Sequence, residues 1–220
     1  MAEVNGTLTR FADGNGLKAG GYGRRDVSGT FTSTDLVPRH TVSNSITWGN
    51  PSAGVYANHH LCGTDDSGEG WGGLVFEYCT SYQNRYNYYT PSRYELTAVT
   101  GSDPINQDAI NYTLTNNLSY SASSLETGYF DVTDETSASQ NTFSGNTFQD
   151  STNTLPASDF ESTDGSLLSS ARASDGSLPD TAFLRIVSTS YWYDKDVGFS
   201  YSRYEEQIAS AREEAGCGLY

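Results

Sequence analysis

A strand-like pattern occurs three times in the first 120 residues of this 220-residue chain, and this repeat restricts the possible folds more than any other feature. The copies lie at residues 39–50, 74–84 and 111–120, and apolar and polar residues alternate in each of them. The superposed positions are Val42/Phe76/Leu114, Ile46/Thr80/Leu118 and Trp48/Tyr82/Tyr120. The copies are therefore spaced by 34 and then 38 residues, and residues 140–148 form a degenerate fourth copy.

A repeat of this length indicates a solenoid, because one coil cannot bury its apolar face alone whereas stacked coils share a continuous core. We interpret each repeat as two or three short strands and a variable loop, with strands of successive coils paired in parallel. One position of the repeat is Asn44 in the first copy, Tyr78 in the second and Asn116 in the third. This pattern predicts a stack of polar side chains at a turn, interrupted by the tyrosine of the middle copy. The alternative is an antiparallel sandwich that reuses one strand pattern, and the number of matching positions favours the parallel coil.

Composition also predicts an all-β protein. Gly, Ser, Thr, Asn, Asp and Tyr dominate, and these residues suit short strands joined by many turns. Helix formers gather only at residues 204–214, where a short C-terminal helix could cap an end of the solenoid. The length fits one domain, with repeated coils over residues 1–120 and a turn-rich tail over residues 121–220 that packs on the last coil.

The chain has 12 basic and 27 acidic residues, a formal net charge of −15, which disfavours nucleic acid as a partner. The first 40 residues carry a net charge of +1 and the remainder −16, so the N-terminal region could meet an anionic ligand that the remainder repels. Acidic surfaces also simply keep proteins soluble, and both interpretations stay open. No apolar stretch is long enough to span a membrane or to act as a signal peptide, which predicts a mature, truncated or cytoplasmic chain.

Two further features of the sequence are its cysteines and an acidic segment. Cys62, Cys79 and Cys217 allow one disulfide and one free thiol, and the sequence does not assign the pair. The segment from Cys62 to Trp71 is predicted to be a loop insertion rich in Gly and Asp. Its acidic run at residues 65–69 could hold a hard cation through oxygen ligands, or it could be merely solvated.

One of the two lysines of the chain, Lys18, lies among glycines at positions 14, 16, 20 and 21. Glycine lets the backbone turn sharply or approach another group closely, and it leaves the lysine unscreened. Such a lysine can be a proton acceptor, a phosphate contact or a turn residue, and a short motif alone does not decide between them. His59 and His60 are adjacent, so on a strand they point to opposite faces and cannot easily share one metal ion.

Residues 14–18, 20–21, 37–40 and 55–60 resemble the catalytic half of polysaccharide lyase family 9, and residues 173–184 and 196–198 resemble the end of those proteins. The segments around Lys18 and His59-His60 are the most specific parts. The resemblance implies a right-handed parallel β-helix of the pectate-lyase-like kind, incomplete at its N-terminal end. It also implies a secreted enzyme that degrades pectin by calcium-dependent β-elimination of polygalacturonate, an acidic polysaccharide of the plant cell wall.

The lysine of Gly-Asn-Gly-x-Lys is the Brønsted base in that family, and Lys18 matches it. Removing the proton alpha to a uronate carboxylate builds negative charge, which calcium offsets while an unprotonated amine accepts the proton. Desolvation or nearby cations favour the unprotonated amine, and Arg24, Arg25 and Arg39 are candidates for those cations. The candidate substrate-binding residues are Arg24, Arg39, His40, Asn58, His59, His60 and Arg93.

The chain departs from the family in its calcium ligands. The family has an aspartate cluster, including an Asp-Asp-x-x-Asp run, on coils before the lysine, whereas the residues before Lys18 contain no such run. The metal ligands are therefore unassigned, and the chain resembles the C-terminal part of a lyase with an open first strand edge. The hypotheses are a lyase fragment with Lys18 as base, a non-catalytic module or inactive remnant that binds acidic polysaccharide, and an adhesin or virus fibre segment that shares only the solenoid.

Overall fold

The computed structural model describes residues 14–20, 39–57, 72–90, 112–121 and 141–214, together with the backbone of short strands at 2–4, 7–9, 62–64, 70–71, 93–96 and 105–108. Most of the strands in these parts belong to parallel sheets, and helix is scarce. Among the described residues, the helices are too short or too polar to cross a membrane.

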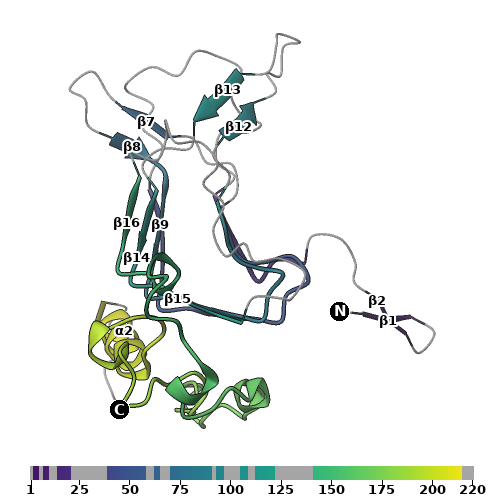
Figure 1. The fold of residues 1–220 in the computed structure, drawn as a ribbon, viewed down its shortest axis with the longest axis vertical. Coiled ribbons are helices and arrows are strands. Elements are labelled where there is room, and N and C mark those ends of the chain that lie inside the picture. Colours follow the sequence, from purple (N-terminus) through teal and green to yellow (C-terminus); the bar gives the residue numbers. More distant parts are fainter. Residues whose placement is uncertain are drawn as a thin grey trace.

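Three parallel sheets each take one strand from successive coils, and in Figure 1 the strands of each sheet lie behind one another. The first contains β3 (Leu17–Ala19), β6 (Ala53–Ala57) and β11 (Tyr86–Tyr89). The second contains β4 (His40–Ser43), β9 (Leu74–Glu77), β14 (Thr113–Thr115) and β16 (Thr142–Ser144). The third contains β5 (Ile46–Trp48), β10 (Thr80–Tyr82) and β15 (Leu118–Tyr120).

The other elements are short antiparallel ribbons and helices. The ribbons pair β1 (Ala2–Val4) with β2 (Thr7–Thr9), β7 (Cys62–Thr64) with β8 (Gly70–Gly72), and β12 (Arg93–Leu96) with β13 (Ile105–Asp108). The helices are the 3-10 turns η1 (Thr147–Gln149), η2 (Ala157–Asp159), η3 (Gly165–Ser169) and η4 (Tyr193–Lys195), and the α-helix α2 (Tyr201–Glu214).

The predicted pairing of the repeats is confirmed position by position. The aligned residues are Val42, Phe76, Leu114 and Phe143 in the second sheet, and Ile46/Thr80/Leu118 and Trp48/Tyr82/Tyr120 in the third. All these strands are parallel, so the antiparallel sandwich is wrong for them. Phe76 and Leu114 are completely buried, because like apolar residues from successive coils stack into one core.

A left-handed residue ends each strand of the second sheet. Asn44 has φ 46°, Tyr78 has φ 53°, Asn116 has φ 53° and Gly145 has φ 67°. This conformation is costly for most residues and least so for Gly and Asn. The sequence prediction of a turn here is confirmed, but the predicted side-chain stack is displaced by one residue, because Asn44 is directed into hydrogen bonds with the backbone of Ser200.

The buried amide ladder lies at the next position of the turn. Asn117 Nδ2 donates hydrogen bonds to Asn146 Oδ1 at 2.8 Å and to the carbonyl of Phe76 at 2.9 Å, while its Oδ1 accepts from the backbone N–H of Cys79 at 2.9 Å. Asn146 Nδ2 in turn donates to the carbonyl of Leu114 at 2.7 Å. The ladder therefore satisfies buried backbone groups of neighbouring coils.

Cys79 occupies the ladder position of its coil as a buried free thiol, and burial raises its pKa to about 11. Between pH 9 and about 11 the thiol ionises in the unfolded chain but not in the folded one, so the free energy of unfolding should fall as pH rises. Near pH 10.5 the loss should be about 2 kcal/mol. Urea denaturation near pH 8 and near pH 10.5 measures it. Cys79→Ser should remove this part of the pH dependence, and an unchanged dependence would contradict the prediction.

The C-terminal tail crosses the outer face of the third sheet. The rings of Tyr120 and Phe160 lie 4.7 Å apart, and the Tyr82 hydroxyl donates to a carbonyl of the tail at 3.1 Å. Gly165 lies so close to Trp48 that a Cβ would come within 2.4 Å of the indole. The tail therefore packs on the coil of Tyr120, as predicted, and it also covers the outward rings of the two earlier coils, Trp48 and Tyr82.

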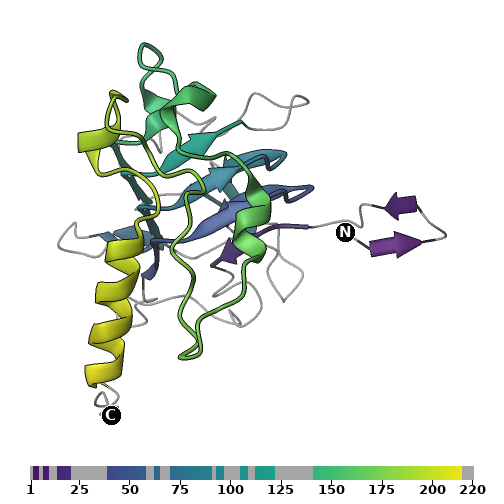
Figure 2. The same ribbon diagram turned by 90° about the horizontal axis from the view of Figure 1, so that it is seen from below.

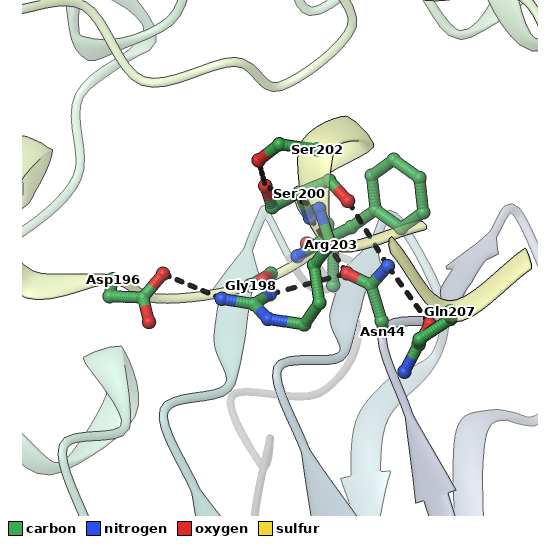
Figure 3. A network of polar contacts seen from close by, with 9 residues as sticks. Asn44, Asp196, Gly198, Ser200, Ser202, Arg203 and Gln207 are labelled. Atoms are coloured by element: carbon green, nitrogen blue, oxygen red, sulfur yellow. Dashed lines mark hydrogen bonds and ion pairs between the residues drawn. The ribbon is translucent and has the colours of Figure 1, made fainter. Parts of the chain in front are cut away.

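Helix α2 is present as predicted, but its described contacts are with the side of the stack rather than with an end, and Figure 2 shows it beside the sheets. Asn44 Oδ1 accepts from Ser200 N at 2.8 Å, and its Nδ2 donates to Ser200 O at 3.1 Å (Figure 3). The Arg203 guanidinium lies 3.7 Å from the centre of the Tyr78 ring and pairs with Asp196 at 2.6 Å. These contacts fix the start of α2 to the left-handed turns of two coils.

Candidate functional site

Lys18 is the middle residue of β3, and its side chain points out of the coil. Leu17 and Ala19 on either side of it pack against the core, whereas Lys18 is exposed. This is the ordinary alternation of a strand that is buried on one face. The structure therefore presents the lysine to solvent from a rigid parallel sheet rather than from a loose turn.

The glycines before Lys18 permit close contact with the next coil. A Cβ at Gly14 would come within 2.4 Å of the Pro51 ring, and one at Gly16 would come within 2.4 Å of the Asn50 side chain. Larger residues would push β3 away from the turn that leads into β6. The glycine-rich stretch thus sets the position of the strand that carries the lysine.

A column of aromatic side chains continues from Lys18 along the outer face of the first sheet. Lys18 pairs in register with Tyr56, and Tyr56 pairs with Tyr89 in the next coil. The Lys18 Nζ lies 5.2 Å from the centre of the Tyr56 ring, and the stacked rings of Tyr56 and Tyr89 are 5.2 Å apart. Tyr86 lies 5.4 Å from Tyr89, and the Arg85 guanidinium lies 5.3 Å from the Tyr86 ring. We call these five residues the tyrosine strip.

The tyrosine strip lies on a part of the protein without acidic residues. Residues 14–20, 49–57 and 83–90, which form this sheet and the turns that lead into it, contain Lys18 and Arg85 but no Asp or Glu. The whole chain has 27 acidic residues, so the lack of Asp and Glu sets these segments apart from the rest of the sequence. An anionic ligand would meet two cations here and no like charge within the sheet itself.

Two other predicted binding residues lie on a different sheet. Arg39 precedes β4 and its Nε donates to the carbonyl of Gly72 at 3.2 Å, while the half-buried His40 begins β4 and pairs with Leu74. The structure thus places His40 on the second sheet and Arg39 just before it, whereas Lys18 lies on the first sheet. The residues predicted for the site that lie outside the described residues, at least in their side chains, are Arg24, Asn58, His59, His60 and Arg93.

The described residues offer no ready calcium site. Among them, no three His, Cys, Asp or Glu side chains are grouped so that they could hold a metal ion. The acidic run at residues 65–69 lies outside the described residues. The segment around it was expected to be a loop, but β7 and β8 form an antiparallel ribbon with Cys62 opposite Gly72.

A cavity of about 540 Å³ lies away from the tyrosine strip, between the C-terminal tail, α2 and the third sheet. Phe183, Leu184, Trp192 and Phe199 line much of it. Among its charged side chains, Arg185 pairs with Asp180 inside the lining and with Glu161 outside it, and Asp196 pairs with Arg203. This cavity contains none of the residues that the sequence predicted for catalysis or binding.

Tyr86, Tyr89 and Arg85 belong to no sequence motif, and Tyr56 lies in the segment 55–60 of the family resemblance but was assigned no role. Tyr56 and Tyr89 are 33 residues apart, close to the spacing of the repeat, and this spacing is the signal that could have revealed them. Because outward tyrosines are common on half-exposed strands, their side-by-side placement emerges only from the pairing of β6 with β11.

Comparison with known proteins finds similarity to solved structures of lyases. No family model and no curated protein matches it. The chain is similar to the structure of a rhamnogalacturonan lyase, with a TM-score of 0.63 and 27% identity over 84% of this chain and 39% of that one. The chain has a pectin-lyase-like fold. A pectate lyase, Pel9A, is 26% identical with a TM-score of 0.45, over 70% of this chain and 30% of that one. The chain thus spans well under half of either protein, and membership of polysaccharide lyase family 9 stays a prediction.

Proposed function

We propose that this pectin-lyase-like chain is part of a polysaccharide lyase that cleaves an acidic polysaccharide of the pectin type by β-elimination. The observation that carries the proposal is the exposed Lys18, which shares its face of the protein with Arg85 and with no acidic residue of the first sheet. The 27% identity with a rhamnogalacturonan lyase over 84% of the chain supports it. We further propose a right-handed parallel β-helix, since crossovers between parallel strands are almost always right-handed, and plant cell-wall pectin outside the cell as the substrate.

Lys18 acts as the Brønsted base in this proposal. Its unprotonated amine takes the proton from C5 of a uronate, the electron pair of that bond forms the C4–C5 double bond, and the C4–O bond breaks. The leaving glycosidic oxygen takes up a proton, so the products are a new chain end and an unsaturated uronide. Lys18 suits the first step because β3 holds its side chain outward, on a face that an anionic sugar chain can approach.

Calcium would offset the negative charge that develops on the uronate carboxylate. The described residues do not fit a calcium site, because no group of potential ligands is assembled among them. We therefore derive no step through the metal, and its ligands stay unassigned.

The direct test is the ultraviolet absorbance of unsaturated uronide released from polygalacturonate and, separately, from rhamnogalacturonan. Each reaction is run with added calcium and with a chelator. We expect absorbance to rise on at least one of the two substrates. Loss of the product in chelator would support the calcium requirement, whereas a folded protein that releases no product from either substrate would contradict present-day lyase activity.

A non-catalytic module that binds acidic polysaccharide is the second candidate. The lack of a ligand cluster among the described residues favours it, because the family chemistry depends on calcium. This candidate predicts no ultraviolet product, but retarded migration in a native gel that contains polygalacturonate. The two measurements together therefore separate a lyase from a binding module.

A further inference from the structure

We infer that the tyrosine strip is a subsite that holds the acidic sugar chain on one side of Lys18. The inference rests on the proposed function, since it concerns the substrate of the same site. The strip begins at Lys18 on β3 and reaches Tyr89 two strands further along the stack, a distance of about 10 Å at the usual strand spacing. A bound chain therefore extends from the base toward the later coils.

The aromatic part of the strip is ordered before a ligand arrives. Tyr56 stacks on Tyr89 with an angle of 29° between the ring planes, and Tyr86 packs against Tyr89 at 51°. Tyrosine combines an apolar ring with a hydroxyl that can donate and accept hydrogen bonds, and rings that are already packed lose little entropy on binding. Such an array suits the mixed apolar and hydroxyl surfaces of sugar rings.

The Arg85 end of the strip selects an anionic chain. Arg85 is exposed, and its guanidinium is placed beside the Tyr86 ring, from which it can form a paired hydrogen bond with a carboxylate. Lys18, the base of the proposed reaction, lies at the other end of the strip. A uronate-containing chain that occupies the strip thus meets the base at the reacting sugar and the positive charge of Arg85 at a sugar some distance from it.

Binding to polygalacturonate, measured by affinity electrophoresis in chelator, tests the subsite without requiring cleavage. Arg85→Gln should weaken binding by about tenfold, the loss expected for one charge-assisted hydrogen bond. Tyr89→Phe, which keeps the ring stack and removes the hydroxyl, should weaken it by about two- to fivefold. Arg172→Gln is the matched control, because Arg172 is also exposed but lies in the C-terminal tail.

The possible results separate the subsite from the lyase proposal. Weaker binding by Arg85→Gln with unchanged binding by Arg172→Gln supports the subsite, whether or not the protein releases product. Equal binding by Arg85→Gln and wild type overturns the subsite and leaves the lyase proposal intact. A neutral galactan bound as tightly as polygalacturonate would overturn the inference that the strip selects acidic chains.

Discussion

Replacing Lys18 with methionine is expected to lower the rate of unsaturated-uronide formation by about 10²- to 10⁴-fold, the usual contribution of a general base. Methionine has a similar length and no amine, so it removes the proton acceptor while it keeps an unbranched chain against Tyr56. The fold should be unaffected because Lys18 is exposed on β3. Initial rates from absorbance, with circular dichroism as the check on folding, measure the effect.

The other lysine of the chain provides a matched control. Lys195 Nζ lies 4.9 Å from the centre of the Tyr191 ring, much as Lys18 lies over Tyr56, but Lys195 belongs to the tail. Lys195→Met should therefore leave the rate unchanged. A second variant, Lys18→Arg, keeps the positive charge but is permanently protonated. It should be as inactive as Lys18→Met if Lys18 is the base, whereas near-normal activity would show that Lys18 only binds substrate.

Replacing Asn117 with leucine is expected to lower the free energy of unfolding by about 3–5 kcal/mol. The side chain is completely buried, and leucine has the same branched shape, with somewhat larger end groups and no polar atoms. The change leaves the N–H of Cys79 and the carbonyl of Phe76 without the hydrogen bonds that the Asn117 side chain supplies, whereas Oδ1 of Asn146 keeps the bond from the backbone N–H of residue 117. Each buried group that loses its partner costs about 1–3 kcal/mol, less what the protein recovers by relaxing.

Urea denaturation monitored by circular dichroism measures this loss. Asn153→Leu is the control, since Asn153 also donates a side-chain hydrogen bond, to Asp150 at 2.7 Å, but within a turn of the tail. Its cost should be about 1 kcal/mol or less. If Asn117→Leu were no more destabilising than Asn153→Leu, the ladder would not be a major source of stability.

The sequence was sufficient to predict the pairing of the coils, because like residues recur at corresponding positions. Val42, Phe76 and Leu114 form one apolar column, and a shift of one residue would have turned this column toward solvent. The position of the amide ladder could not be predicted from the repeat in the same way. Asn44 and Asn116 look like ladder residues, but the left-handed backbone at these positions leaves the ladder to Asn117 and Asn146.

The packing of the tail was beyond sequence analysis because the tail has no repeat. Nothing in the pattern around Gly165 indicates that it lies against Trp48, more than one hundred residues earlier, and only the shape of the outer face explains this contact. The same limit applies to α2, whose placement depends on how Arg203 meets Tyr78.

The sequence predicted the central residue of the candidate site but not the residues around it. The glycine-rich motif singled out Lys18, and the structure places this residue on an outward face. Tyr56, Tyr89 and Arg85 belong to different strands or turns, and their contact depends on the parallel pairing of β6 and β11. A sequence motif describes one continuous segment, so it does not reveal a surface that several coils build together.

The tail that crosses the third sheet also affects how the protein loses its structure. Stacked coils interact mainly with their neighbours, so a simple stack unravels one coil at a time from its ends. Here Trp48 of an early coil and Tyr120 of a later one both rest on the same tail, and Asn44 is hydrogen-bonded to the residue that precedes α2. Opening the early coil therefore also breaks contacts of the tail. We expect this linkage to make the coils and the tail one cooperative unit, in which the edge of the stack should exchange its amide hydrogens almost as slowly as its centre.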